Sequence, residues 1–97
     1  MSKARQLQQE VEKTLKNVEE GCELFEQLLW KARNAATPPQ REKFDQDLKR
    51  EIKKLQRFRD KLRAYQTSSE IRDKTPIVDC RKRIDSKYLV LLLHMLE

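Results

Sequence analysis

Two consecutive prolines, Pro38 and Pro39, divide a chain whose apolar residues otherwise recur every three or four positions. Proline lacks the backbone N–H that an interior helical residue donates, so one helix cannot continue through the pair. Before the prolines, the apolar residues fall on a single helical stripe. This stripe is Leu7, Val11, Leu15, Val18, Cys22, Phe25, Leu29, Ala32 and Ala36. The pattern predicts a first helix over about residues 4–36.

The proline segment also contains a helix start signal. Thr37 is suited to be an N-cap, Pro38 takes the favoured first helical position, and Gln40 stands where a capping box requires Gln or Glu. We therefore expect a second helix over about residues 38–66. Its apolar stripe is Phe44, Leu48, Ile52, Leu55, Phe58, Leu62 and Tyr65.

So short a connection makes the two helices antiparallel neighbours. Residues paired symmetrically about the turn bring the two stripes into common layers over a hairpin roughly 40 Å long at about 1.5 Å per residue. The layers are Ala32 with Phe44, Leu29 with Leu48, Phe25 with Ile52, Cys22 with Leu55, Val18 with Phe58, Leu15 with Leu62, and Val11 with Tyr65. Gly21 costs the first helix about 1 kcal/mol relative to Ala, and we interpret it as a close approach between the helices.

A second cap signal, Thr75-Pro76, predicts a third helix over about residues 76–96. The apolar side of this helix, its inner face, should cover Leu24 and Leu28, which form an apolar shoulder beside the stripe of the first helix. Trp30 also lies outside that stripe and should be covered by another helix. The inner face is Ile77, Ile84, Tyr88, Leu91 and Met95. The expected fold class is all-α: one domain over residues 1–97, a long antiparallel coiled-coil hairpin with a third helix packed on it.

Composition argues against catalysis and against bound metal. A single glycine among 97 residues leaves no glycine-rich phosphate loop, and Cys22, Cys80 and His94 make no zinc-ligand pattern. His94 sits in an apolar run without an evident carboxylate or nucleophile partner, Cys22 belongs to the core stripe, and Cys80 lacks a base. We expect a protein that is not an enzyme and holds no cofactor.

The absence of a secretory signal pattern and of paired cysteines favours the cytoplasm, with the nucleus as a second compartment.

The run from Tyr88 to Leu96 is apolar on all sides, so one neighbouring helix cannot hide it. Nine helical residues reach only about 14 Å, too short for a bilayer core of about 30 Å, so we expect no membrane span. Three interpretations remain open: a buried helix end, a self-association surface, or part of a longer chain.

The positive charge is concentrated on the second helix. The chain has a net charge of +6, and residues 41–63 alone carry +5. Arg50, Lys54, Arg57 and Lys61 are spaced four, three and four apart and therefore line one flank, with Lys53 and Lys49 continuing round the back. Cations about 5–6 Å apart along a helix suit the phosphates of an RNA strand, so these six residues are the predicted RNA- or ribosome-binding site.

A competing interpretation assigns the same cations to structure. Glu19, Glu20, Glu23 and Glu26 lie on the first helix opposite this part of the second helix, and interhelical ion pairs could take up several of the bases. Exposed ion pairs contribute about 0–1 kcal/mol each, and charged runs on helices are usually solvated faces. The flank that points away from the first helix therefore decides between RNA binding and a purely structural role.

Several segments resemble a known family. They are Arg5–Gln8, Glu10–Lys13, Leu15–Gly21, Glu42–Phe44, Asp47–Arg57, Arg59-Asp60, Ser69–Lys74, and Arg81-Lys82 with Ile84. Together they resemble the amino-terminal domain of Not subunits three and five of the eukaryotic Ccr-Not deadenylase complex. The resemblance implies a non-catalytic helical module of a scaffold subunit that docks on the ribosome near the tRNA exit site and couples slow decoding to mRNA decay.

The resemblance also implies partners and has a limit. Other subunits of the complex are expected to bind through the carboxy-terminal Not-box region, which is not in this sequence. After Ile84 the family continues as a polar helix, whereas here Asp85-Ser86-Lys87 leads into the apolar run. The chain is therefore interpreted as a fragment, a truncated isoform or a divergent paralogue, and the role of the apolar run as undetermined by sequence.

Overall fold

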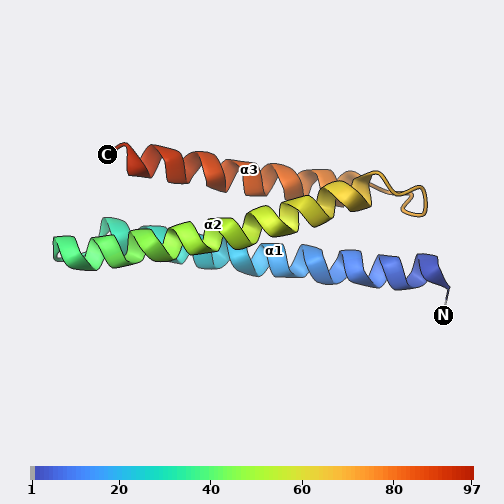
Figure 1. Ribbon diagram of the computed structural model, residues 1–97, viewed down its shortest axis with the longest axis horizontal. Helices are drawn as coiled ribbons and strands as arrows, with labels where there is room; N and C mark the ends of the chain where they lie inside the picture. The colour runs from blue at the N-terminus through green and yellow to red at the C-terminus, as the bar shows by residue number, and fades with distance from the viewer. Residues whose placement is uncertain (1) are drawn as a thin grey trace.

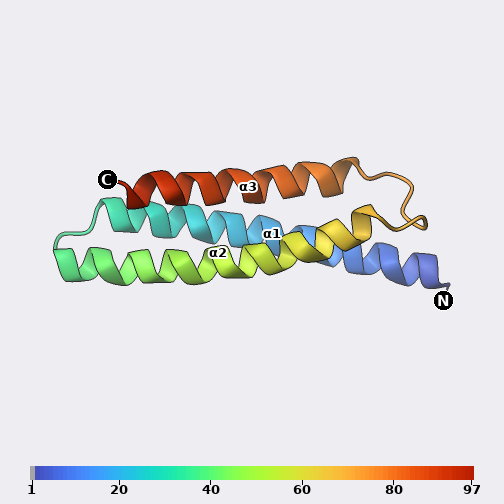
Figure 2. The same ribbon diagram turned by 45° about the horizontal axis from the view of Figure 1, so that its top comes forward.

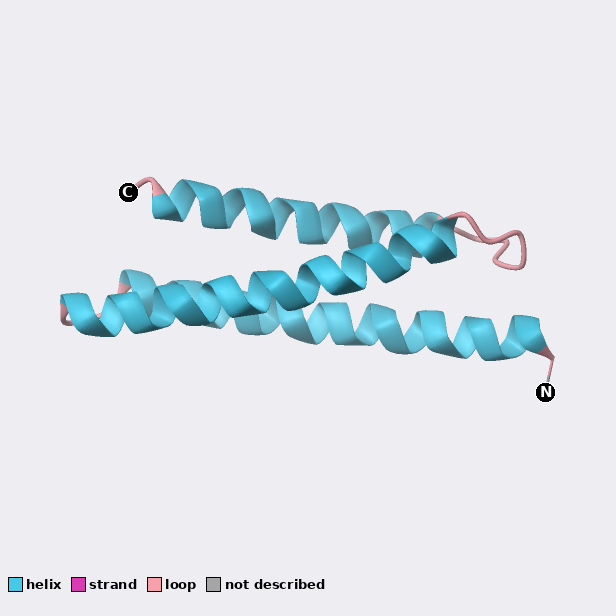
Figure 3. Ribbon diagram, viewed as in Figure 1, coloured by secondary structure: helices cyan, strands magenta, loops and turns pink. Residues whose placement is uncertain are grey.

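The computed structural model describes residues 2–97, which form three helices and, within that range, no strand (Figure 3). Helix α1 spans Lys3–Arg33, α2 spans Pro38–Gln66 and α3 spans Thr75–Met95. They lie side by side in an elongated bundle with principal dimensions of 53 × 22 × 15 Å (Figure 1). The start of α1 and the end of α3 lie at opposite ends of the bundle, and α3 runs antiparallel to α2 (Figure 2). The all-α class and the three predicted helices are confirmed.

The helix boundaries follow local chemistry. Helix α1 ends at Arg33, three residues earlier than expected, because the Asn34 side chain donates to the Trp30 carbonyl at 2.8 Å and closes the last turn. Ala36 therefore lies outside the helix. At the start of α2, the Gln40 N–H donates to Thr37 Oγ1 at 3.4 Å, as a cap requires. The Gln40 side chain accepts from the Ala36 N–H at 3.2 Å rather than from Thr37, so the predicted capping box is only half formed.

The start of α3 differs from the prediction. Thr75 is the first helical residue and not an N-cap, since Lys74 occupies that position without a side-chain capping bond. Asp73 Oδ1 instead accepts from the Thr75 N–H at 3.1 Å. The carboxylate satisfies one of the donors that the helix start leaves open.

The core is a row of apolar side chains along the line where the three helices meet. Helices α1 and α2 have the predicted antiparallel register: a Cβ on Gly21 would lie 2.9 Å from Leu55 Cδ2, so the glycine does mark a close approach. The fully or nearly buried side chains are Val11, Val18, Cys22, Phe25, Ala32, Leu48, Ile52, Leu55, Leu62, Ile71, Ile77, Ile84 and Leu91. Most predicted stripe residues belong to this set, and Leu7, Leu15, Leu29, Phe44, Phe58 and Tyr65 pack partly buried against it.

Helix α3 packs on a different side of the hairpin from the one expected. It contacts α1 through the Lys87–Glu26 ion pair and shares a groove with Leu15 and Val18. Leu24 remains exposed and lines a groove between α1 and α2 together with Leu28, away from α3. The expectation that α3 covers this shoulder is wrong, because the α1 edge carrying Val18 and Glu26 is the one that meets α3.

The contact at Gly21 predicts a strong coupling with Leu55. Gly21→Ala gains about 1 kcal/mol of helix propensity but forces a Cβ to within 2.9 Å of a fully buried Leu55, and overpacking costs about 1–3 kcal/mol. We expect a net loss of about 1 kcal/mol in the free energy of unfolding, measured by urea denaturation.

A double-mutant cycle provides the control. Leu55→Ala alone should cost about 2–5 kcal/mol, and the double variant should cost less than the sum, because the added methyl occupies space that Leu55 vacates. Additive costs would contradict the close approach.

Candidate nucleic-acid interface

Arg50, Lys54, Arg57 and Lys61, which we call the basic ridge, lie along one exposed edge of α2. This edge borders α1: Arg50 and Lys54 line one groove between the two helices, of about 290 Å³. Lys61 lines a second groove, of about 410 Å³. The structure therefore brings the four principal predicted residues together on one edge.

The ridge faces away from α3. Contacts from α2 to α3 come from another edge, where Asp45 meets His94 and Arg59 meets Asp85 at 3.1 Å. The secondary residues Lys53 and Lys49 are also exposed. At 100° per residue they lie farther round α2, on its outer side, as the sequence indicated.

Two ridge cations have carboxylates near them, both from α2 itself. Arg50 Nη1 lies 3.5 Å from Asp47 Oδ1, and Lys54 Nζ lies 3.7 Å from Glu51 Oε2. The two basic side chains nevertheless stay 74% and 61% exposed. Such exposed pairs are worth about 0–1 kcal/mol, so they orient the cations without withdrawing them from solvent.

The other ridge cations are unpaired in the described part of the chain. Arg57 takes part in no ion pair among residues 2–97, and the ammonium of Lys61 lies 6.0 Å from the centroid of the Phe58 ring. At that distance the cation–π attraction is at its outer limit. The ridge thus presents two unneutralised charges beside two weakly paired ones.

The competing interpretation of interhelical neutralisation is wrong. Among residues 2–97, no ion pair joins α1 to α2. Glu26 pairs instead with Lys87 of α3, and the hydrogen bond from that ammonium lowers the pKa of the Glu26 carboxyl. Glu19, Glu20 and Glu23 are exposed on α1. The lysines and arginines of α2 therefore do not neutralise the carboxylates of α1.

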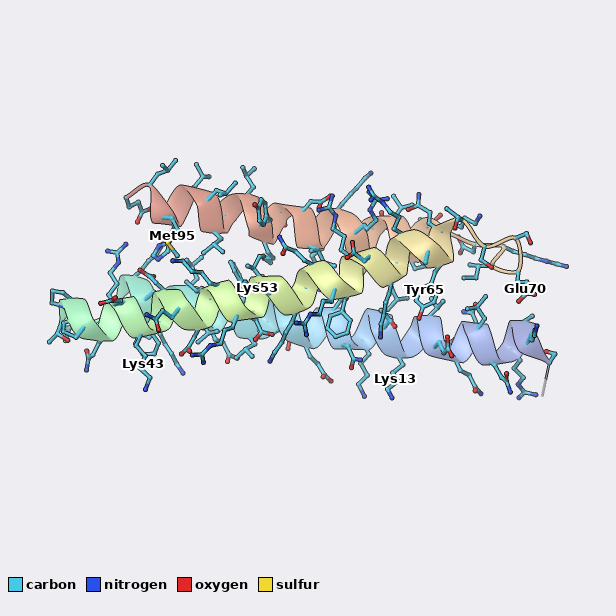
Figure 4. The ribbon with its side chains drawn as sticks, in the orientation of Figure 1. Lys13, Lys43, Lys53, Tyr65, Glu70 and Met95 are labelled. Carbon is cyan, nitrogen blue, oxygen red and sulfur yellow. The ribbon has the colours of Figure 1, made fainter. Side chains whose placement is uncertain are left out.

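Two further lysines extend the ridge, and both were missing from the predicted site. Lys43 is exposed and seven residues before Arg50, hence on the same edge. Lys13 of α1 lines the groove that also contains Lys61. Both side chains project away from α3 in Figure 4. The spacing could have identified Lys43, whereas Lys13 requires the register between the helices.

Aromatic side chains contribute little near the ridge. Phe44, Phe58 and Tyr65 pack against the core, as expected. Trp30 is 67% exposed, so the expectation that another helix covers it is wrong. It lies four residues after Glu26, which pairs with Lys87 of α3, and three before Arg33, which pairs with Glu97 just after α3. Trp30 therefore lies on the α1 edge that meets α3. Trp30 is therefore not beside the ridge.

His94 does have a carboxylate partner, contrary to the sequence interpretation. Its buried Nε2 lies 2.7 Å from Oδ1 of Asp45, which is 49 residues away in the chain. Nδ1 is buried, has no hydrogen-bond partner among residues 2–97, and lies 3.9 Å from Glu97 Oε2. This pair ties α3 to α2.

The cysteines are both free and both shielded. Burial raises the pKa of the Cys22 thiol, and it raises the pKa of Cys80 to about 11.

Among residues 2–97, no three His, Cys, Asp or Glu side chains gather closely enough to hold a metal ion. None of the helices in this range combines the length and apolarity needed to cross a bilayer.

The family model described as "Not1 N-terminal domain, CCR4-Not complex component" matches residues 3–88. The chain belongs to this family. It is 40% identical over 84 residues to general negative regulator of transcription subunit 3 of Schizosaccharomyces pombe, and 39% identical over 82 residues to the subunit of that name in Saccharomyces cerevisiae. It is 38% identical over 82 residues to subunit 5 of Saccharomyces cerevisiae. The resemblance found in the sequence is confirmed.

The aligned segments differ greatly in the share of each protein that they cover. They make up 87%, 84% and 82% of this chain but only 13%, 10% and 15% of the three relatives. The chain therefore spans only a small part of the length of these relatives. Its relatives are named as regulators, and the CCR4-Not family match ends at Tyr88, where the apolar run begins.

The raised pKa of Cys80 predicts that its thiol reacts slowly with alkylating reagents. At pH 8.0 a thiol with a pKa of about 11 is roughly 0.1% thiolate, against about a quarter for a free cysteine of pKa 8.5. We expect alkylation of Cys80 by iodoacetamide in the native protein to be roughly two-hundredfold slower than that of free cysteine. Mass spectrometry of the reacting protein measures the rate. The rate should reach the free value in denaturant, and a rapid native reaction would contradict the shielded site.

Proposed function

We propose that this CCR4-Not domain is a non-catalytic helical adaptor that docks on ribosomal or other RNA through the basic ridge and links translation to mRNA turnover. The observation that carries the proposal is that Arg50, Lys54, Arg57 and Lys61 share one solvent-exposed edge that no other helix neutralises. The family membership supports a component of a complex that regulates transcription and mRNA decay.

The geometry of the ridge suits a phosphate backbone. Side chains three and four residues apart on a helix lie about 5–6 Å apart, a spacing that allows successive cations to contact successive phosphates. The bundle is a narrow rod, 22 Å by 15 Å across, which suits insertion along a groove walled by RNA. Since the aromatic rings near the ridge belong to the core, phosphate contact and shape should dominate over base readout.

The wider role follows from the relatives. Because the chain matches only 10% to 15% of their length, we propose that other CCR4-Not subunits are bound through regions outside this chain. Such an adaptor would work in the cytoplasm, where translation occurs. The printed names of the relatives, regulators of transcription, make the nucleus a second proposed compartment.

A second candidate function is a structural protein–protein scaffold without direct RNA contact. The observation that favours it is the exposed apolar surface on α3, where Leu89, Leu93 and Leu96 face solvent. On this alternative, binding would be insensitive to salt, because apolar contacts release no counterions. The experiments below therefore separate the two candidates.

Charge reversal of the ridge tests the proposed function. We expect Arg50→Glu/Lys54→Glu/Arg57→Glu to abolish co-sedimentation with ribosomes while circular dichroism remains unchanged, because all three side chains are exposed. The matched control is Arg5→Glu/Lys16→Glu/Lys82→Glu, which makes the same change in net charge at exposed positions away from the ridge. The control should keep most of the binding. Equal loss in both variants, or unchanged binding in the first, would contradict a ridge-specific contact.

Salt dependence gives an independent measurement. If four to six phosphates are neutralised, the logarithm of the binding constant for a single-stranded RNA should fall against the logarithm of salt concentration with a slope of roughly −3 to −4. Removing one contact with Arg57→Ala should reduce the magnitude of the slope by about 0.7. Fluorescence anisotropy of a labelled oligonucleotide measures both values, and a slope near zero would favour the scaffold candidate.

A further inference from the structure

The carboxy-terminal half of α3 exposes an apolar surface that the other two helices do not use. Only Leu91 and His94 are buried in this half. Exposed leucines lie around them on the outside of the helix, and we call these leucines the outer leucine face. It consists of Leu89 (58% exposed), Leu92 (47%), Leu93 (56%) and Leu96 (83%). In Figure 4 the side chains that project from this half of α3 away from α1 and α2 are drawn almost wholly in carbon.

Three further exposed apolar residues adjoin this face. Tyr88 and Met95 lie on the same helix, one on each side of Leu92 along the chain. Both were expected on the inner face of this helix, but they are 42% and 38% exposed, so that expectation is wrong for these two residues. Trp30 lies on the α1 edge that meets α3, at the level between the Glu26–Lys87 pair and the Arg33–Glu97 pair. Contiguous exposed apolar surface of several hundred Å² usually marks an interaction site, and exposed tryptophan is enriched at the centres of interfaces.

The chemistry of the face restricts its occupant. From Tyr88 to Leu96 the only side chain that could carry charge near neutral pH is His94, and it is buried. The face therefore offers nothing to RNA phosphates or to an acidic segment, both of which suit the ridge on the opposite side of the molecule. A surface that covers this face must itself be uncharged and apolar.

A second copy of this chain supplies such a surface. When two α3 helices lie antiparallel about a two-fold axis between Leu92 and Leu93, Leu89 of each copy meets Leu96 of the other, and Leu92 meets Leu93. Antiparallel packing also opposes the helix dipoles. It directs the rest of each bundle away from the axis, so the two positively charged ridges stay apart.

We propose that the outer leucine face is a self-association surface through which two copies pair by their α3 helices. The exposed side chains offer roughly 500 Å² of apolar surface per copy, less than the roughly 800 Å² per partner of a standard stable interface. The dimer is therefore weak, with a dissociation constant on the order of 10–100 μM. This surface is independent of the ridge and of the proposed RNA contact.

Sedimentation equilibrium of the whole chain from 5 μM to 500 μM (roughly a decade on either side of the expected constant) tests the proposal. The expected result is a reversible monomer–dimer equilibrium in the wild type, unaffected by salt between about 0.1 and 0.5 M, because no charges cross the interface. Leu89→Gln/Leu93→Gln should weaken dimerisation at least tenfold. Both positions are exposed and glutamine is a good helix former, so helicity and thermal stability should be retained.

The matched control is Leu24→Gln, which removes an exposed leucine from α1 at a site away from α3. It should dimerise as the wild type does. A monomeric wild type throughout the concentration range would overturn the proposal. So would a double variant that dimerises as tightly as the control, since the interface would then lie elsewhere.

Cysteine crosslinking tests the antiparallel arrangement. In a Cys80→Ser background, Leu93→Cys places the new thiol beside the two-fold axis and should form an intermolecular disulfide under mild oxidation. Lys82→Cys, also exposed, lies about ten residues from the axis, so its two copies would be roughly 30 Å apart and should not crosslink. Efficient crosslinking at residue 82 with none at residue 93 would overturn the proposed pairing.

Discussion

The antiparallel packing of α1 against α2 determines everything else in this molecule. Gly21 lets Leu55 approach α1, and this contact fixes the register of the two helices along their length. Once the register is fixed, the face of α2 that enters the core is fixed too, and the edge carrying Arg50, Lys54, Arg57 and Lys61 must remain outside. The basic surface is thus a consequence of core packing, since no charge–charge interaction between α1 and α2 places it there among residues 2–97.

Charge is divided between the two sides of the hairpin. Among residues 2–97, the ion pairs between lysine or arginine and a carboxylate of another segment involve α3 or Glu97, which follows it. They are Lys87 with Glu26, Arg59 with Asp85, and Arg33 and Arg41 with Glu97. Each exposed pair contributes little to stability, but together they specify the side of the hairpin on which α3 packs. Because those acids are used there, the opposite side retains its excess of cations.

The sequence was sufficient for the hairpin because apolar periodicity and proline chemistry act locally. Both stripes, their register and the exposure of the six predicted cations follow from spacing alone. The position of α3 does not, because contacts such as His94–Asp45 join residues 49 positions apart. Spacing cannot show which of two apolar shoulders a third helix will cover, so the expectations for Leu24 and Trp30 were wrong. Lys13 was missed for a related reason: its proximity to Lys61 exists only after the helices pair.

The two exposed surfaces differ in chemistry and lie on opposite sides of the bundle, so they need not compete. The proposed RNA contact at the ridge would act by counterion release and would weaken as salt rises, whereas the outer leucine face carries no charge and its proposed pairing depends on apolar contact. Pairing through α3 would leave both ridges accessible and turned outward. A second RNA contact would then be intramolecular, so two weak contacts could act together at an effective concentration set by the rigid rods. In that arrangement a weak dimer is an advantage, since RNA bound at both ridges would stabilise the pair that the leucines alone hold only loosely.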